Sequence, residues 1–462
     1  MDMGKGWRRL LAVTLVLAAF AAACGGDDDG GSSGDASGDC GGGDTITVPT
    51  DCGTIQEAVD SAAEGALILV EPGVYEEAVD VATDDLTIRG LDRNEVILEG
   101  NFELENGIRI VEADGVVVEN MTAQNYTRNG FFWTGSDGYR GSYLTAIRNG
   151  DYGVYAFGSV NGVFEHSYAS GSPDAGFYIG QCFPCNALID NVVSEWNGLG
   201  YSGTNSGGDL TIVNSVFRNN RAGVVPNSGT YEGCYPQRET TIVGNYVHDN
   251  GNEETDSIAS ALLAQGTGIT VTGGIGNVVE RNRVEDNPLA GIAVVPLPED
   301  DPIAPIPDEA DWPTDCVEDA VAAPEDVIAE LDNPLLWESY DNRVAENVVS
   351  GSDEWNIVLL TLSGEAQGNC FTDNEVADGV TAPPDIDTAI SCDGADQTYA
   401  PETARFLEIV SIEHPEPPDF QTVDLPDPGP QENMPDAADA PAEPAGAPRT
   451  VDVTAITVPA AG

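Results

Sequence analysis

The sequence predicts an all-β solenoid, a parallel β-helix in which short strands stack coil upon coil. The first observation is a glycine repeat with spacings of 23, 23, 24 and 23 residues, carried by Gly130, Gly153, Gly176, Gly200 and Gly223. The register returns at Gly291 after 68 residues, close to three further periods. The second observation is that β-branched runs of three to five residues lie between the repeats without an intervening helix, which excludes βαβ units. Because one coil buries almost nothing, coils must stack about 4.8 Å apart to build a continuous apolar interior.

A series of asparagines supports the same stacking. Each is followed by valine within two residues: Asn191, Asn214, Asn245, Asn282, Asn347 and Asn374. Stacked asparagines at a turn can hydrogen-bond along the axis of a repetitive β structure. His166 falls in the same column as Asn120 and Asn214, so we expect a structural turn position for it.

These repeats resemble the right-handed parallel β-helix proteins of the pectate-lyase-like superfamily over roughly residues 45–395. The segment Gly73-Val-Tyr75-Glu-Glu77 is similar to the Gly-x-Tyr-x-Glu segment of pectinesterases, which in that superfamily helps to build the first coil. The signature catalytic segments of pectate lyases, pectinesterases and polygalacturonases are not found. The resemblance therefore implies a fold and transfers no catalytic residue.

The chain is also similar to the β-helix domain of nitrous-oxide-reductase accessory proteins, which are named as copper-binding. Copper prefers clusters of His, Met or Cys. This chain has only three histidines, at scattered positions, and four methionines, two of them among the first three residues. We therefore expect no copper site.

The N-terminal segment has the pattern of a secretory signal. A charged start with Lys5, Arg8 and Arg9 precedes an apolar run over residues 10–23. Its end resembles the lipobox of bacterial lipoproteins, which implies removal of residues 1–23 and diacylation of Cys24. The apolar run of about 14 residues is too short to span a bilayer. We expect an extracytoplasmic protein anchored to the cell membrane through its lipid alone, with a soluble secreted product as the alternative.

Three regions follow the signal. Residues 24–44 are a flexible acidic tether, and residues 45–395 are the β-helix, with insertions near 251–265 and 298–338. Within the β-helix, Thr54–Glu57 is a capping box that begins a short helix through Ala63, expected to plug the open end of the solenoid. Residues 396–462 form a Pro-, Ala- and Asp-rich acidic tail, which we expect to be mostly disordered.

Charge and cysteine content bound the function. With 79 acidic and 17 basic residues the net charge is −62, which excludes a nucleic-acid partner. Lys5 lies in the signal, so the mature chain has no lysine chemistry. The acidic surface suits a saline setting, or alternatively divalent cations spread over the surface. Once Cys24 carries lipid, eight cysteines remain, which favours disulfides in an exported protein, including a local Cys182–Cys185 bridge.

Two columns of the repeat predict a binding face. Strand alternation turns the second residue after each glycine outward, so Phe132, Tyr155 and Tyr178 would form an aromatic row suited to stacking on sugar rings. The alternative is an aromatic stack covered by neighbouring loops.

The column two residues before the glycine places Asp151 and Asp174 on adjacent coils, flanked by Arg128 and Arg221. Carboxyl groups about 5 Å apart have the spacing used by retaining glycosidases, and the arginines could hold an acidic sugar. Ordinary turn aspartates with neutralising arginines are the structural alternative. A calcium ion at the same pair is a third interpretation; no other cofactor is indicated.

The sequence therefore favours a monomeric cell-surface lipoprotein that binds an extracellular polysaccharide, with or without cleaving or modifying it. If it is an enzyme, a polysaccharide lyase or glycoside hydrolase is expected, with Asp151 and Asp174 as the catalytic pair. The alternative is a non-catalytic envelope or adhesion module whose long face only makes contacts.

Overall fold

A computed structural model describes residue 40, residues 43–299, 305–306 and 308–316, and residues 335–461 without 362, 378–379, 395–396, 401, 410 and 447. The signal segment, Cys24 and most of the tether lie outside the described residues, as does much of the second insertion. Internal contacts divide the chain into Met1–Ser37 and Gly38–Gly462, and every described residue belongs to the second unit.

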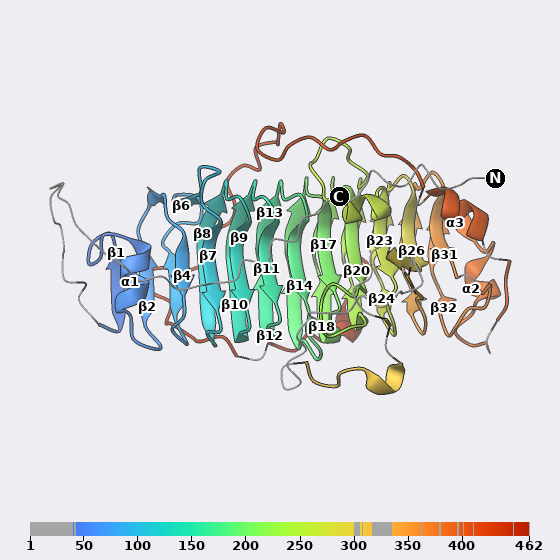
Figure 1. The fold of residues 1–462 in the computed structure, drawn as a ribbon, viewed down its shortest axis with the longest axis horizontal. Helices are drawn as coiled ribbons and strands as arrows, with labels where there is room; N and C mark the ends of the chain where they lie inside the picture. Colours follow the sequence, from blue (N-terminus) through green and yellow to red (C-terminus); the bar gives the residue numbers. More distant parts are fainter. Residues whose placement is uncertain are drawn as a thin grey trace. The chain divides into compact units, whose positions relative to one another are not determined.

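The second unit is the parallel β-helix expected from the sequence (Figure 1). Three ladders of parallel strands run along it, and two of them merge into one 21-stranded sheet because the long strands β8 and β10 bend and take part in both. The first ladder consists of β1 (Thr45–Val48), β2 (Leu67–Val70), β5 (Thr87–Gly90), β8 (Val116–Gln124), β10 (Asp137–Ile147), β12 (Val160–Glu165), β15 (Ala187–Asp190), β18 (Gly207–Val213), β21 (Arg238–Val243), β24 (Val278–Glu280), β29 (Arg343–Ala345) and β32 (Cys370–Thr372).

The second ladder continues the same sheet beyond the bend. It contains the second halves of β8 and β10 together with β3 (Gly73–Tyr75), β6 (Val96–Glu99), β13 (Tyr168–Ser170), β16 (Val193–Glu195), β19 (Val216–Arg218), β22 (Tyr246–His248), β25 (Arg283–Glu285), β30 (Val348–Ser350) and β33 (Glu375–Ala377). At the bend, Asn120, His166 and Asn214 all have φ between 51° and 57°. His166 thus holds the turn position expected of it, and asparagine tolerates this left-handed conformation better than most residues.

The third ladder is a separate 11-stranded sheet on which the candidate site lies. It contains β4 (Val79–Val81), β7 (Asn106–Val111), β9 (Asn129–Thr134), β11 (Tyr152–Phe157), β14 (Ala175–Gly180), β17 (Leu199–Thr204), β20 (Ala222–Asn227), β23 (Thr267–Thr272), β26 (Ala290–Val295), β31 (Trp355–Leu359) and β34 (Thr381–Ala382). The residue directly after each repeat glycine faces inward, and this column is fully buried with its members in register: Phe131, Val154, Phe177, Tyr201, Val224 and Ile292.

The predicted spacing before Gly291 needs correction. Only one coil, that of β23, lies between β20 and β26, with Ile269 pairing to Val224 on one side and Ile292 on the other. The 68-residue gap is therefore two coils and not three, because the first insertion lengthens one of them.

The asparagine ladder is real but mixes two columns. Asn245, Asn282 and Asn347 are buried, and each backbone N–H donates to the side-chain oxygen of the asparagine in the next coil, at 3.0, 2.9 and 3.1 Å. Asn191 and Asn214 instead occupy the neighbouring left-handed position. Each buried asparagine satisfies turn groups that would otherwise be buried without a partner.

Short helices cover both ends of the stack. Helix α1 (Ile55–Ser61) buries Ile55, Ala58 and Val59, and its N-cap Thr54 accepts a hydrogen bond from the Glu57 N–H. Glu77, from the pectinesterase-like segment, caps the same helix by accepting from the N–H groups of residues 55 and 56, each at 3.1 Å. At the other end, helix α2 (Ile386–Ala389) places Asp387 at the last rung, where it accepts from both nitrogens of Asn374.

Four disulfides use all eight cysteines among the described residues: Cys40–Cys52, Cys182–Cys185, Cys234–Cys316 and Cys370–Cys392. The first insertion contains the 3₁₀ helix Ser260–Ala264. The second begins and ends with the antiparallel pair β27 (Leu297–Glu299) and β28 (Leu335–Trp337) and includes a 3₁₀ turn at Glu309–Asp311. Residues 317–334 of this insertion lie outside the described residues.

The C-terminal tail is the part of the chain that the sequence predicts to be mostly disordered. After helix α3 (Thr403–Ile409) it has little regular structure, only the 3₁₀ turn Val453–Ala455, as its Pro-rich composition suggests. Its described residues nevertheless lie along the solenoid (Figure 1). Arginines of the coils, among them Arg89, Arg93 and Arg148, donate hydrogen bonds to its backbone carbonyls, an interaction that composition does not reveal.

Candidate functional site

The outer face of β9, β11 and β14 carries the aromatic row. Phe132 pairs with Tyr155 and Tyr155 with Tyr178 in the strand register, and successive ring centroids are 4.7 and 4.8 Å apart. Tyr152, three residues earlier in the same strand, stacks on Tyr155 with ring centroids 4.3 Å apart. Phe132 and Tyr155 stay partly exposed, whereas Tyr178 is only 1% exposed. The row therefore offers an open end at Phe132 and Tyr155 and a covered end at Tyr178.

The predicted carboxylates occupy consecutive coils beside this row. The Asp151 N–H donates to the Arg128 carbonyl at 2.8 Å, and the Asp174 N–H donates to the Asp151 carbonyl at 3.1 Å. Coils stack about 4.8 Å apart, so the two carboxyl groups begin one coil spacing from each other. The guanidinium of Arg128, which is largely exposed, lies 3.4 Å from Asp151.

Asp174 is the more perturbed of the two carboxyl groups. Its pKa is raised to about 7, mainly by burial; the hydrogen bond from the Tyr152 hydroxyl opposes the rise, and the negative charge of Asp151 adds to it. Burial also raises the pKa of Asp151, but the cation of Arg128 opposes that rise. At neutral pH the coil pair thus combines a carboxyl group that is half protonated with one that has a cationic partner.

Glu232 is a third carboxyl group, and the sequence analysis missed it. The loop between β20 and β21 brings it over the covered end of the row, where it accepts a hydrogen bond from the Tyr178 hydroxyl at 2.6 Å. Its pKa is raised to about 8, mainly by burial; the hydrogen bond from Tyr178 opposes the rise, and the negative charge of Asp174 adds to it. Its Oε2 atom is buried without a hydrogen-bond partner. The only signal in the sequence is Cys234 two residues later, whose disulfide to Cys316 fixes this loop.

Arg221 does not join the site. It is 1% exposed, and its guanidinium donates to the carbonyls of Glu253 and Thr255 and to the Gln265 side chain. Its column position is as predicted, but its donors are satisfied by the first insertion. We therefore assign Arg221 to anchoring that insertion and remove it from the substrate-binding set.

The first insertion forms a wall next to the carboxyl groups. The Ile258 N–H donates to the Pro173 carbonyl at 3.1 Å, directly before Asp174. Apolar side chains of the insertion, Ala261 and Ala264, pack on the outer face of β14, β17 and β20. This packing accounts for the burial of Asp174 and hence for its raised pKa.

The arrangement can hold and move protons. Asp174 and Glu232 have pKa values of about 7 and about 8, so each can be protonated near neutral pH and each can act as an acid or a base. The exposed aromatic rings supply a flat apolar surface beside them. Together these features define a parallel β-helix protein with an acidic, aromatic site on the outside of one sheet.

The chain belongs to the family described as "Periplasmic copper-binding protein (NosD)", whose model matches residues 65–301, about half of the chain. This family is periplasmic by its description. Among the described residues, no helix is both long and apolar enough to cross a membrane. No curated protein sequence matches the chain.

Three solved structures match the chain at low sequence identity and with TM-scores below 0.5. The mannuronan C-5 epimerase AlgE4 A-module of Azotobacter vinelandii is 15% identical, with a TM-score of 0.47, over 70% of this chain and 90% of that one. The alginate lyase of Paenibacillus sp. str. FPU-7 is 15% identical, with a TM-score of 0.37, over 54% and 90%. The endo-xylogalacturonan hydrolase of Aspergillus tubingensis is 15% identical, with a TM-score of 0.36, over 71% and 90%.

The residues present do not fit the copper that the family description names. All eight described cysteines are in disulfides. The Nδ1 atom of His166 lies 2.6 Å from the Asn191 amide, and that of His248 lies 2.6 Å from Asp249. Nowhere in the described part of the chain do three His, Cys, Asp or Glu side chains gather in a group that could hold a metal ion.

Proposed function

We propose that the chain is an extracytoplasmic lipoprotein, anchored through Cys24, that binds and processes an extracellular polysaccharide on the outer face of β9, β11 and β14. The observation that carries the proposal is a pair of protonatable carboxyl groups, Asp174 and Glu232, beside a partly exposed aromatic pair. The signal segment and the periplasmic family support the location. Solenoid faces walled by insertions are common binding surfaces, which supports the choice of face.

The site residues divide into binding and chemistry. Phe132 and Tyr155 stack on sugar rings, and Arg128 with its exposed guanidinium contacts the same chain. Asp174 in its protonated form donates a proton to the glycosidic oxygen of the substrate. Asp151, one coil away, is the partner carboxylate, at a spacing close to the roughly 5–5.5 Å of retaining glycosidases. Tyr178 orients Glu232 and does not contact the sugar, because it is buried.

Glycan retention and product formation test this proposal separately. The full chain is passed over uronate, neutral and sulfated glycans, and products are then analysed for the glycans that retain it. Asp174→Asn should abolish turnover and leave retention unchanged, whereas Phe132→Ala should weaken retention. The control is Asp209→Asn, which makes the same substitution at an exposed position of β18.

Retention without any product would favour the alternative, a non-catalytic envelope or adhesion module. The coverage of Tyr178 by the Glu232 loop is the feature of this face that fits that alternative. Absence of retention on every glycan would refute the proposed function.

A further inference from the structure

The C-terminal tail runs along the solenoid towards its first coils and then back, and it makes contacts with the coils in both directions. Four of its backbone N–H groups donate to the coils or to the first insertion: Phe420 to Asp256, Gln431 to Asn94, Met434 to Asn120 and Ala445 to Gly115, at 2.7–2.9 Å. The segment thus travels towards the first coils and turns back. We name residues 419–459 the strap.

Arginines of the coils hold the outward limb of the strap, residues 420–441, which runs towards the first coils. Arg148 donates to the carbonyls of Phe420 and Gln421 at 3.3 and 3.1 Å. Arg93 donates to the Glu432 carbonyl at 3.0 Å, and Arg89 to the carbonyls of residues 437, 440 and 441 at 2.6–3.3 Å. These acceptors are neutral backbone groups and not carboxylates.

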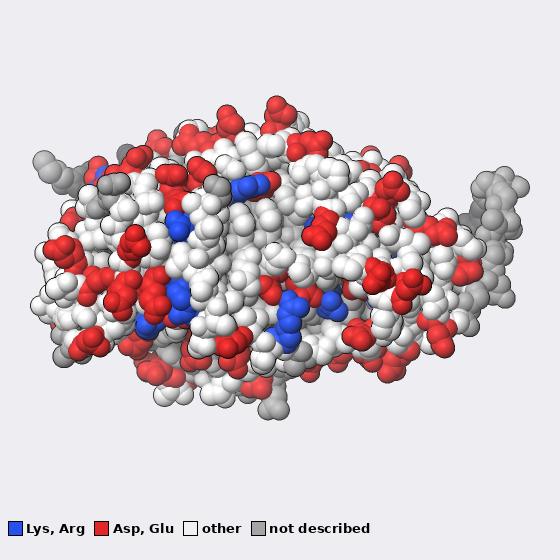
Figure 2. Space-filling model, turned by 180° about the vertical axis from the view of Figure 1, so that it is seen from behind, with Lys and Arg blue, Asp and Glu red and all other residues white. Residues whose placement is uncertain are grey.

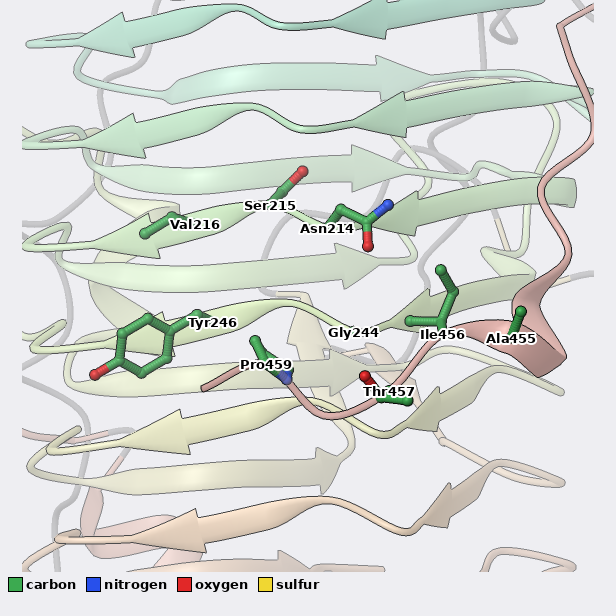
Figure 3. Close-up of a pocket in the computed structure, with 9 residues that line it drawn as sticks. All are labelled: Asn214, Ser215, Val216, Gly244, Tyr246, Ala455, Ile456, Thr457 and Pro459. Carbon is green, nitrogen blue, oxygen red and sulfur yellow. The ribbon is translucent and has the colours of Figure 1, made fainter. Parts of the chain in front are cut away.

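The returning limb of the strap, residues 445–459, adds apolar contacts. Val451, Val453 and Ile456 pack on an outward-facing stripe of valine and leucine side chains: Val163, Leu188, Val213 and Val243. Figure 3 shows the end of this limb, where Ile456 and Thr457 lie beside Gly244 and Asn214 and line a pocket between strap and coil. Arg281 and Arg283 donate to the carbonyls of Val453 and Pro459, at 2.8 and 2.7 Å.

Electrostatics works against this docking. The strap has eight acidic residues and one arginine, a charge of −7, which leaves −55 on the rest of the chain. Figure 2 shows acidic side chains spread over the face that it draws, with few arginines among them. The repulsion between two negative bodies reaches about 30 Å at 0.01 M salt and only about 3 Å at 1 M.

We propose that docking of the strap depends on ionic strength: the strap docks on the solenoid at high ionic strength and is released at low ionic strength. Salt screens the long-range repulsion and leaves the short-range contacts in place, since hydrogen bonds to neutral carbonyls and apolar contacts are not ion pairs. The exception is Arg449, half exposed, which pairs with Glu165 and Asp190 at 2.8 and 2.6 Å. Release of the strap uncovers the apolar stripe and the coil arginines that hold the strap.

Hydrogen–deuterium exchange of the full chain tests the proposal. Peptides covering residues 419–446 contain the four N–H donors, and peptides of β11 and β14 serve as the internal reference. We expect the strap peptides to exchange at least about tenfold more slowly at about 1 M than at about 0.01 M sodium chloride, while the reference peptides stay protected at both. Equal exchange at both salts, or faster exchange at high salt, would overturn the proposal, as would a simultaneous loss of protection in the reference peptides.

A matched pair of variants tests the role of the arginines. Arg148→Gln removes two hydrogen bonds to the strap, whereas Arg109→Gln removes an equal charge from an ion pair with Asp80 away from it. At about 1 M salt Arg148→Gln should raise strap exchange several-fold above the Arg109→Gln control. If the two variants exchange alike, coil arginines do not hold the strap, and the proposal fails.

Discussion

Asp174 makes the stability of the fold depend on pH in a way that one substitution can isolate. Its pKa in the folded protein is about 7, against an ordinary value of 3.8. The folded state therefore holds the proton more tightly than the unfolded chain, and stability is lost as the pH rises through the window from 3.8 to about 7. A shift of about three pKa units at about 1.4 kcal/mol each means that at most about 4 kcal/mol of stability is lost, and this loss is complete above that window.

Asp174→Asn keeps the size of the side chain and removes its ionisation. Between pH 5 and pH 8 the natural protein should lose about 2–3 kcal/mol more of its free energy of unfolding than the variant does, because this pH range covers the upper part of the window. Urea denaturation at the two pH values, at one fixed ionic strength, measures the difference. Asp209→Asn, at an exposed position of β18, should show no such gain. Parallel pH profiles for Asp174→Asn and the natural protein would refute the assignment of a raised pKa to this carboxyl group.

Three further predictions test the ladder, the loop and the site. Asn282→Ala leaves buried turn groups of its neighbours without partners and should cost about 2–4 kcal/mol by urea denaturation, whereas a loss below 1 kcal/mol would mean that water replaces the amide. Replacing Cys234 and Cys316 together by serine opens a loop of 82 residues and should lower the free energy of unfolding by up to about 4 kcal/mol; an unchanged denaturation midpoint would contradict this. Tyr178→Phe removes the hydrogen bond that lowers the pKa of Glu232 and should move that titration, followed by ¹³C NMR of the carboxyl group, to higher pH, whereas an unmoved titration would mean that the hydrogen bond is not made.

Sequence periodicity predicted the scaffold because a solenoid turns sequence spacing into spatial contact. The register of β9, β11 and β14 follows directly from the glycine spacing, and so does the adjacency of Asp151 and Asp174. The coil of β23 was missed because the first insertion separates it from the preceding glycine by more than one period. Period alone therefore places coils well only between insertions.

The environment of the site could not be predicted, because it depends on segments outside the repeat. Glu232 lies in a loop that belongs to no column, and its position follows from a disulfide to a distant segment. The same limitation applies to Arg221, whose column predicted an open guanidinium that the first insertion in fact occupies. Loops set which column residues are accessible, and their folding leaves no periodic trace.

The buried rung between Asn282 and Asn347 has a consequence for how such a protein can diversify. These residues are 65 positions apart in sequence, yet they form one rung by direct hydrogen bonds. A stretch of dozens of residues between them can thus be exchanged, shortened or replaced by unrelated sequence while the rungs on either side keep their geometry. New surface chemistry can be acquired at this junction without redesign of the interior.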